Sequence, residues 1–301
     1  MAGTFKVLSI EDIDLAKLSF VMKNNPKTIG GSKVEKDLVL MYDNAPLPLL
    51  QVGRLSPDPT RTDPVTLWQG LQYYVMPAKP SEKGKFQRVN DCKDVDWTKS
   101  MPKTAGKKKT AKLMATVSLN RNTEIGQKTI AFFKHYEQMI IDAYRHGVRG
   151  PDGQVAYPFP EMKDMPEAMA RNMFKSSLWR DPGPDQVSAN GTRYNPDIKV
   201  RLRVFVQEDA TTKNPTHLST SVNGREFQPN PNYDPTDATS RAFVDKDITD
   251  LFEYLSQPAE GALILTLGDA SLGMKDCFTD LTLDKARLRR LERVAQGNFN
   301  D

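Results

Sequence analysis

The stretch KVRLRVF, from Lys199 to Phe205, carries side chains that could bind a chain of phosphates. Apolar residues alternate strictly with cations, and this period-2 pattern predicts a β-strand with one buried face. The apolar residues are Val200, Leu202 and Val204, and the cations are Lys199, Arg201 and Arg203. Residues on one face of a strand repeat at roughly 7 Å, close to the phosphate spacing of an extended nucleic-acid strand. A row of cations ending at the ring of Phe205 therefore indicates single-strand binding, although an edge strand with solvated charges has the same pattern.

A second basic stretch runs from Lys99 to Arg121 and contains no acid between Asp96 and Glu124. Its cations are Lys99, Lys103, Lys107, Lys108, Lys109, Lys112 and Arg121. Residues 102–110 have no apolar periodicity and are expected to form a mobile loop before a strand over 113–119. A solvated loop would have the same composition. At the rim of a barrel, such a loop would contact phosphates and make binding dependent on salt.

Aromatic residues supply the flat surfaces on which bases stack. Trp68, Tyr73 and Tyr74 lie on a predicted strand over 65–76, where the adjacent tyrosines must face opposite sides. Trp179 and Arg180 follow Lys175 in a second aromatic and basic group. Each ring also suits a hydrophobic core, and for a single ring that is the more frequent role.

Composition is typical of a folded protein, and its charge permits an anionic partner without requiring one. The chain has 301 residues, 38% of them apolar, and a formal net charge of +4. Two cysteines make a disulfide framework improbable, and the sequence contains neither an apolar signal core nor an apolar run of membrane-spanning length. We expect a soluble, intracellular protein with no membrane association.

No catalytic or metal-binding motif is evident. The three histidines, His135, His146 and His217, have no ligand-like spacing with Cys92 and Cys277. Phosphate-binding glycine loops and a nucleophile elbow are missing from the sequence. The sequence thus predicts a non-enzymatic protein without a cofactor.

The order of predicted elements favours a mainly β fold with inserted helices. Strands are predicted over 37–42, 49–55, 65–76, 113–119, 198–206 and 261–267, with Gly70 as a bulge or tight bend. Helices are predicted over 124–145, 161–178, 245–256 and 284–296. This order is typical of an oligonucleotide-binding (OB) fold, a five-stranded barrel. We expect one such domain over 1–281, with a helical insertion at about 124–180 and a long loop at 207–242. A basic C-terminal helix and tail are expected over 282–301.

Five segments carry a resemblance to a known family: SIEDIDLAKLSF, LVLMYDNAPLPLL, IAFFKHYEQMIIDAY, MFKSSLWRD and YNPDIKVRLRVF. Their order resembles the predicted single-stranded DNA-binding proteins of large nucleocytoplasmic DNA viruses. These are similar to the replication single-strand binder of short-tailed phages, an OB-fold protein. The resemblance covers roughly residues 7–205 and implies that Lys175, Trp179, Lys199, Arg201 and Arg203 lie on or beside the binding face. The phage family ends in an acidic tail closed by an aromatic residue, whereas here the residues before Phe299 are basic.

The expected function is non-catalytic, sequence-independent binding of single-stranded DNA in viral or phage-like replication, recombination or repair. Expected partners are single-stranded DNA, further copies of the chain and replication proteins. The compartment would be the host nucleus or a viral replication site. Two alternatives remain open: a structural virion protein whose β-barrel makes subunit contacts, and an RNA-binding accessory factor.

Overall fold

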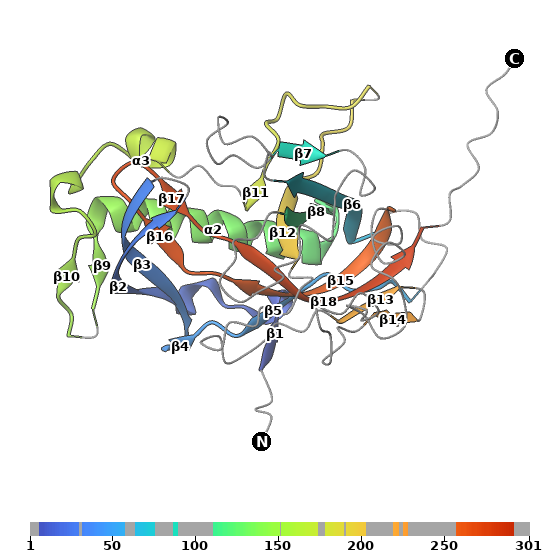
Figure 1. The fold of residues 1–301 in the computed structure, drawn as a ribbon, viewed down its shortest axis with the longest axis horizontal. Coiled ribbons are helices and arrows are strands. Elements are labelled where there is room, and N and C mark those ends of the chain that lie inside the picture. Colours follow the sequence, from blue (N-terminus) through green and yellow to red (C-terminus); the bar gives the residue numbers. More distant parts are fainter. Residues whose placement is uncertain are drawn as a thin grey trace, which may run out of the picture.

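A computed structural model gives the fold of the chain (Figure 1). The structure describes residues 6–29, 32–57, 64–75, 87–89, 111–150, 152–173, 178–189, 191–202, 219–222, 225–227 and 257–291. For residues 70–75, 87–89, 111–113, 173, 219–222 and 225–227 the description is of the backbone. The protein is mainly β, as its sequence predicted.

Five strands close into a mixed barrel that resembles an OB fold. They are β6 (Thr66–Val75), β8 (Ala111–Leu119), β12 (Asp197–Leu202), β15 (Ala259–Leu267) and β18 (Leu281–Arg290). Around the barrel their order is β6, β8, β12, β18, β15 and back to β6, and of these pairings β12–β18 alone is parallel. β8 and β12 are thus the second and third barrel strands along the chain.

Short strands extend the barrel sheet at its edges. They are β1 (Val7–Ser9), β5 (Leu49–Val52), β7 (Gln87–Val89), β11 (Trp179–Arg180), β13 (Ser219–Val222) and β14 (Arg225–Phe227). β5 pairs with β15, β11 with β12, and β13 with β18. The described sheet is therefore wider than the five strands of the barrel itself.

A second sheet lies beside the barrel (Figure 1). Its strands are β2 (Leu18–Ile29), β3 (Ser32–Tyr42), β4 (Ala45–Pro46), β16 (Ala270–Leu272) and β17 (Cys277–Phe278). β16 and β17 belong to the connection between β15 and β18, so the two sheets share this hairpin. Asp37 of β3 holds β16 to the second sheet, because its buried carboxylate accepts a hydrogen bond from Ser271 Oγ of β16 at 2.6 Å. The same carboxylate also accepts from Lys27 Nζ of β2 at 2.8 Å. Burial alone would raise the Asp37 pKa, but these bonds lower it.

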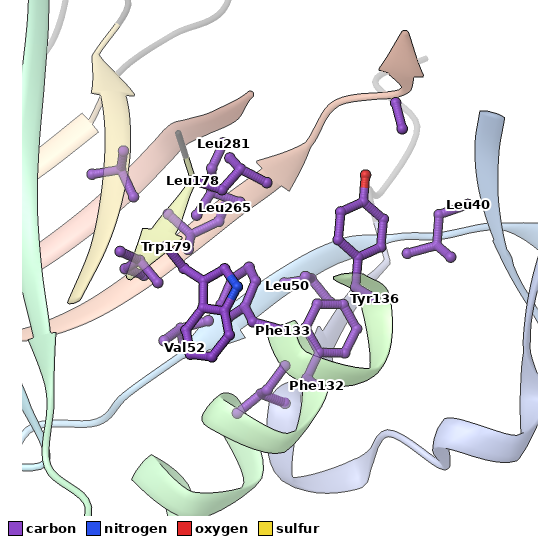
Figure 2. Packing of buried hydrophobic residues seen from close by; sticks show 14 of the residues in the cluster. Leu40, Leu50, Val52, Phe132, Phe133, Tyr136, Leu178, Trp179, Leu265 and Leu281 are labelled. Atoms are coloured by element: carbon purple, nitrogen blue, oxygen red, sulfur yellow. The ribbon is translucent and has the colours of Figure 1, made fainter. Parts of the chain in front are cut away.

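Helix α2 (Glu124–His146) packs against both sheets through one apolar stripe. The Thr123 hydroxyl caps its first turn by accepting from Gly126 N, and Gly147 ends it at φ 74°, a conformation that favours glycine. Near the middle of the helix Phe133 stacks on Trp179 (Figure 2). One turn further along, Tyr136 meets Phe20 of β2 edge to face. The helix therefore joins the barrel and the second sheet in one hydrophobic core.

The remaining described elements are small. They are the 3₁₀ helices η1 (Ile10–Asp12), η2 (Leu15–Lys17) and η4 (Pro160–Met162), the helix α3 (Glu167–Met173), and the hairpin of β9 (Val148–Arg149) and β10 (Val155–Ala156). The predicted helix over 161–178 is thus shorter in the structure. The predicted helix over 245–256 and most of the 207–242 loop lie outside the described residues.

One sequence prediction about local structure is wrong, and one is confirmed. Asn25 and Pro26 are turn-forming types, yet β2 continues through them as a bulge opposite β3. The predicted basic helix at 284–296 is strand β18 up to Arg290, which closes the barrel, so residue 282 is not a domain boundary. The predicted bulge at Gly70 is confirmed, since the β6–β8 register shifts between Trp68 and Leu71.

Candidate nucleic-acid interface

The outer face of β12 carries the cations that the sequence predicted. Ile198, Val200 and Leu202 are buried in the barrel core. Lys199 and Arg201 alternate with them, are partly exposed and point outward. The alternation predicted from the sequence is therefore confirmed for this part of the strand.

On the neighbouring strand β8, the residues beside these cations are Met114, which is partly exposed, and Thr116 and Ser118, which are buried. Thr116 is the cross-strand partner of Lys199, and Met114 is the partner of Arg201. Directly paired residues on antiparallel strands share a face. Met114 and Thr116 carry no charge, so among the side chains described on this stretch of the two strands, the charges come from β12.

Two acids lie close to the outer-face cations, which the sequence pattern did not predict. Arg201 Nη1 lies 3.5 Å from Asp280 Oδ2, and Arg180 Nη2 lies 2.8 Å from Asp197 Oδ2. Asp197 has the same strand parity as Lys199, so Arg180 also lies on the outer face. Among the residues that the structure describes, Lys199 forms no ion pair. The row therefore holds three cations, two of them with a carboxylate partner.

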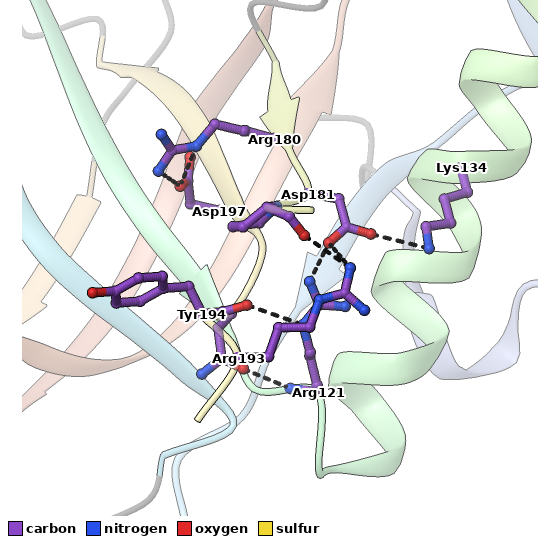
Figure 3. A network of polar contacts seen from close by, with 9 residues as sticks. Arg121, Lys134, Arg180, Asp181, Arg193, Tyr194 and Asp197 are labelled. Atoms are coloured by element: carbon purple, nitrogen blue, oxygen red, sulfur yellow. Dashed lines mark hydrogen bonds and ion pairs between the residues drawn. The ribbon is translucent and has the colours of Figure 1, made fainter. Parts of the chain in front are cut away.

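Asp181 organises a second group of cations beside this face (Figure 3). Its carboxylate pairs with Arg121, with Lys134 Nζ at 3.1 Å and with Arg193 Nη2 at 3.4 Å. Burial raises the pKa of Asp181, but hydrogen bonds from Arg121 and Lys134 outweigh it, and the net pKa is lowered. One carboxylate thus faces three cations, which leaves an excess of positive charge.

Two tryptophans predicted as stacking surfaces belong to the core instead. Trp68 is 0% exposed, and Trp179 is buried against Phe133, with Nε1 donating to Glu137 Oε2 at 3.1 Å (Figure 2). Neither ring has a free face for a base. Tryptophan at a barrel strand supplies a large apolar area, and here core packing uses all of it.

Several predicted binding residues are only partly placed, or not placed, by the structure. Tyr73, Tyr74 and Lys112 have a described backbone, in which Tyr74 on β6 pairs with Lys112 on β8. Predicted residues outside the described part of the chain are Lys107, Lys108, Lys109, Lys175, Arg203 and Phe205. Lys107–109 belong to the connection between β6 and β8. Their predicted role stays a prediction.

The sequence analysis missed Tyr194 and Arg193, which lie beside the Asp181 group. Tyr194 is 53% exposed, and its carbonyl accepts a hydrogen bond from Arg121 Nε at 3.1 Å. A signal was available, because Gly191 and Pro196 flank the tyrosine with turn-forming residues. Such residues predict a surface loop, and rings in surface loops are exposed more often than rings on strands.

Other kinds of site find little support in the described residues. No cluster of three or more His, Cys, Asp or Glu side chains there is arranged to hold a metal ion. No helix of the described chain is both long and apolar enough to cross a membrane. A polar hollow of about 490 Å³ lies beside Trp179, lined by charged residues of α2 and α3 that already pair with one another, such as Arg171 and Glu137.

Comparisons with known proteins leave the family resemblance as a prediction. No protein-family model matches the sequence, and no curated protein shows a significant match to it.

Proposed function

We propose that this protein binds single-stranded DNA along the outer face of β8 and β12, largely independently of base sequence. The observation that carries the proposal is the row of Arg180, Lys199 and Arg201 on that face. In OB folds, the face of the second and third strands binds oligonucleotides. The charge and the fold therefore favour the same surface.

The loops around this face add to the argument. In OB folds the connections between strands one and two and between strands four and five also contact the ligand. Here the first of these connections, between β6 and β8, contains the basic run Lys107–Lys109. The second contains Asp280, which pairs with Arg201. A DNA phosphate would replace Asp280 as the partner of Arg201, so binding exchanges one anion for another.

The proposal is tested by fluorescence anisotropy with labelled oligo-dT. We expect submicromolar binding that weakens steeply with salt, because phosphate contacts release counterions. A K199A/R201A/R203A variant should lose about tenfold or more in affinity while keeping its fold. The matched control is K6A/K17A/K128A, which removes the same charge from exposed lysines elsewhere.

Three outcomes would redirect the assignment. Failure of the wild-type protein to bind oligo-dT at low salt would overturn the proposal and favour a structural role. Tighter binding to oligo-U than to oligo-dT would favour RNA as the partner. Equal loss of affinity in the two triple variants would show binding through net charge, not through the β8–β12 face.

A further inference from the structure

We propose that Tyr194 is a base-stacking residue, and that the cations around it hold the phosphates on either side of the stacked base. The inference rests on the proposed function and extends it. The DNA would continue past the start of β12 onto the loop over 181–196. Tyr194 begins the segment YNPDIKVRLRVF, which carries part of the family resemblance, but neither the sequence pattern nor the resemblance assigned this tyrosine a role.

Exposure is the first argument. Among the residues whose side chains are described, Tyr194 is the one aromatic residue that is largely exposed to solvent. In Figure 3 its ring extends away from the Asp181 group, in which Arg121 and Arg193 take part. A ring with a free face can stack on any base, since every base has a π-face.

Pre-organisation is the second argument. Tyr194 N donates to Gln186 O at 3.2 Å, and Tyr194 O accepts from Arg121 Nε at 3.1 Å. Arg121 N also donates to Asn195 Oδ1 at 3.2 Å, and Val187 forms a β-bridge with Arg193. The backbone under the ring is therefore held on both sides. A ring on a fixed backbone loses less entropy on binding than one on a free loop.

Charge is the third argument. Asp181 is only 16% exposed, whereas Lys134 and Arg193, which pair with it, have side chains that are 56% and 40% exposed. The carboxylate of Asp181 is therefore largely covered, whereas the charged side chains of Lys134 and Arg193 are more exposed to solvent. Asp185 is the other acid of this part of the loop, and within the described residues it makes no ion pair with these cations. The surface beside the ring thus favours an anionic ligand.

Continuity with the β12 face is the fourth argument. Tyr194 precedes the first residue of β12, Asp197, by three positions, and Arg180 pairs with Asp197 on the outer face. Lys199 is five positions after Tyr194, and an extended chain of that length spans at most about 18 Å. At roughly 7 Å per nucleotide, the value used for the β12 row, the ring lies at most two to three nucleotides from Lys199. A single oligonucleotide can therefore occupy both.

The experiment combines affinity and cross-linking. Y194A should weaken oligo-dT binding at least about fivefold, which corresponds to the lower bound for stacking of one base. Y194F keeps the ring and should bind like the wild type. Y157A is the matched control, because Tyr157 already lies against Lys163 at 5.5 Å and is remote from the β12 strand in sequence. Ultraviolet cross-linking of wild-type protein to oligo-dT containing 5-iododeoxyuridine should label Tyr194, as mapped by mass spectrometry.

The outcomes separate this inference from the proposed function. If the wild type does not bind oligo-dT at all, both fail. If binding depends on Lys199 and Arg201 while Y194A binds like the wild type and no cross-link maps to residues 186–196, the inference on Tyr194 is overturned and the proposed function stands. Circular dichroism of Y194A checks the fold, and the cross-link and Y194F results do not depend on that variant.

Discussion

Two carboxylate–arginine pairs on the barrel have the same chemistry and opposite surroundings. Glu260 of β15 pairs with Arg289 of β18, accepts from Ser56 N at 2.8 Å, and has a side chain that is only 2% exposed. Asp280 lies 3.5 Å from Arg201, and its side chain is 49% exposed. A buried pair cannot lose one partner without leaving a desolvated charge, whereas an exposed pair contributes little. Burial, more than pairing, therefore separates a structural cation from one that is free to exchange its carboxylate partner for the phosphate of the proposed ligand.

The largest expected effect comes from breaking the buried pair. Glu260→Ala leaves Arg289 and Ser56 N without their carboxylate partner, and should lower the free energy of unfolding by about 3 kcal/mol. Urea denaturation followed by circular dichroism measures the loss. Asp280→Ala is the control and should lower it by less than about 0.5 kcal/mol. Similar losses in both variants would contradict the distinction by burial.

The next effect concerns the outer-face cations. K199A/R201A should reduce oligo-dT affinity about tenfold and should make the slope of log K against log salt shallower by about 1.4, since each single-strand phosphate contact contributes about 0.7. Anisotropy titrations at several salt concentrations measure this slope. An unchanged slope with reduced affinity would mean that these cations do not contact phosphates.

Asp181 is an intermediate case, because its side chain is 16% exposed and its cation partners are more exposed. Its pKa is lowered in the folded state, so its contribution to stability is present above the unfolded value of about 3.9 and is lost as the pH falls through the folded pKa. Asp181→Asn should therefore destabilise the protein by about 1 kcal/mol at pH 7 and progressively less below pH 4.

Urea unfolding at pH 7 and pH 3 tests the Asp181 prediction. Asp185→Asn is the control, because that exposed side chain forms no ion pair with the described residues. A difference between Asp181→Asn and the wild type that stayed constant from pH 7 to pH 3 would show that ionisation of Asp181 is not its cause.

The smallest effect is a gain in affinity. Asp280→Asn removes the carboxylate that competes with phosphate for Arg201, and should tighten oligo-dT binding by up to about fivefold, the limit set by an exposed ion pair. Asp152→Asn makes the same change in net charge on an exposed turn elsewhere. Equal gains in the two variants would point to overall charge and not to release of Arg201.

The sequence predicted an element correctly where its apolar residues followed one period throughout, and wrongly where a bulge interrupted that period. Helix α2 has a 3.6-residue apolar stripe, a capping threonine and a terminal glycine; it begins at the predicted residue and ends one residue later than predicted. The pattern of β18 was interpreted as a helix because the strand contains a bulge at Asp284. Ile264 and Leu265 of β15 pair with Lys285 and Leu283 of β18, so Asp284 between them has no cross-strand partner on β15. This bulge interrupts the alternation of Leu281 and Leu283 with the later Ala286 and Leu288, so the period-2 pattern is hidden.

The candidate site was less predictable than the fold. The parity of Lys199 and Arg201 follows from a strand pattern and was predicted. Asp280 comes from a distant segment, and strand pairing brings Arg180 to Asp197. Residue type alone cannot tell that Trp179 packs on a helix while Tyr194 faces solvent. These differences depend on tertiary packing, which one sequence without its fold does not contain.

The place of β18 in the chain has a consequence for biosynthesis. The barrel closes only when β18 pairs with both β12 and β15. During translation, β12 leaves the ribosome long before β18, its partner in the closed barrel. We therefore expect the nascent chain to expose open strand edges until residue 290 has emerged, which makes it a natural client for chaperones.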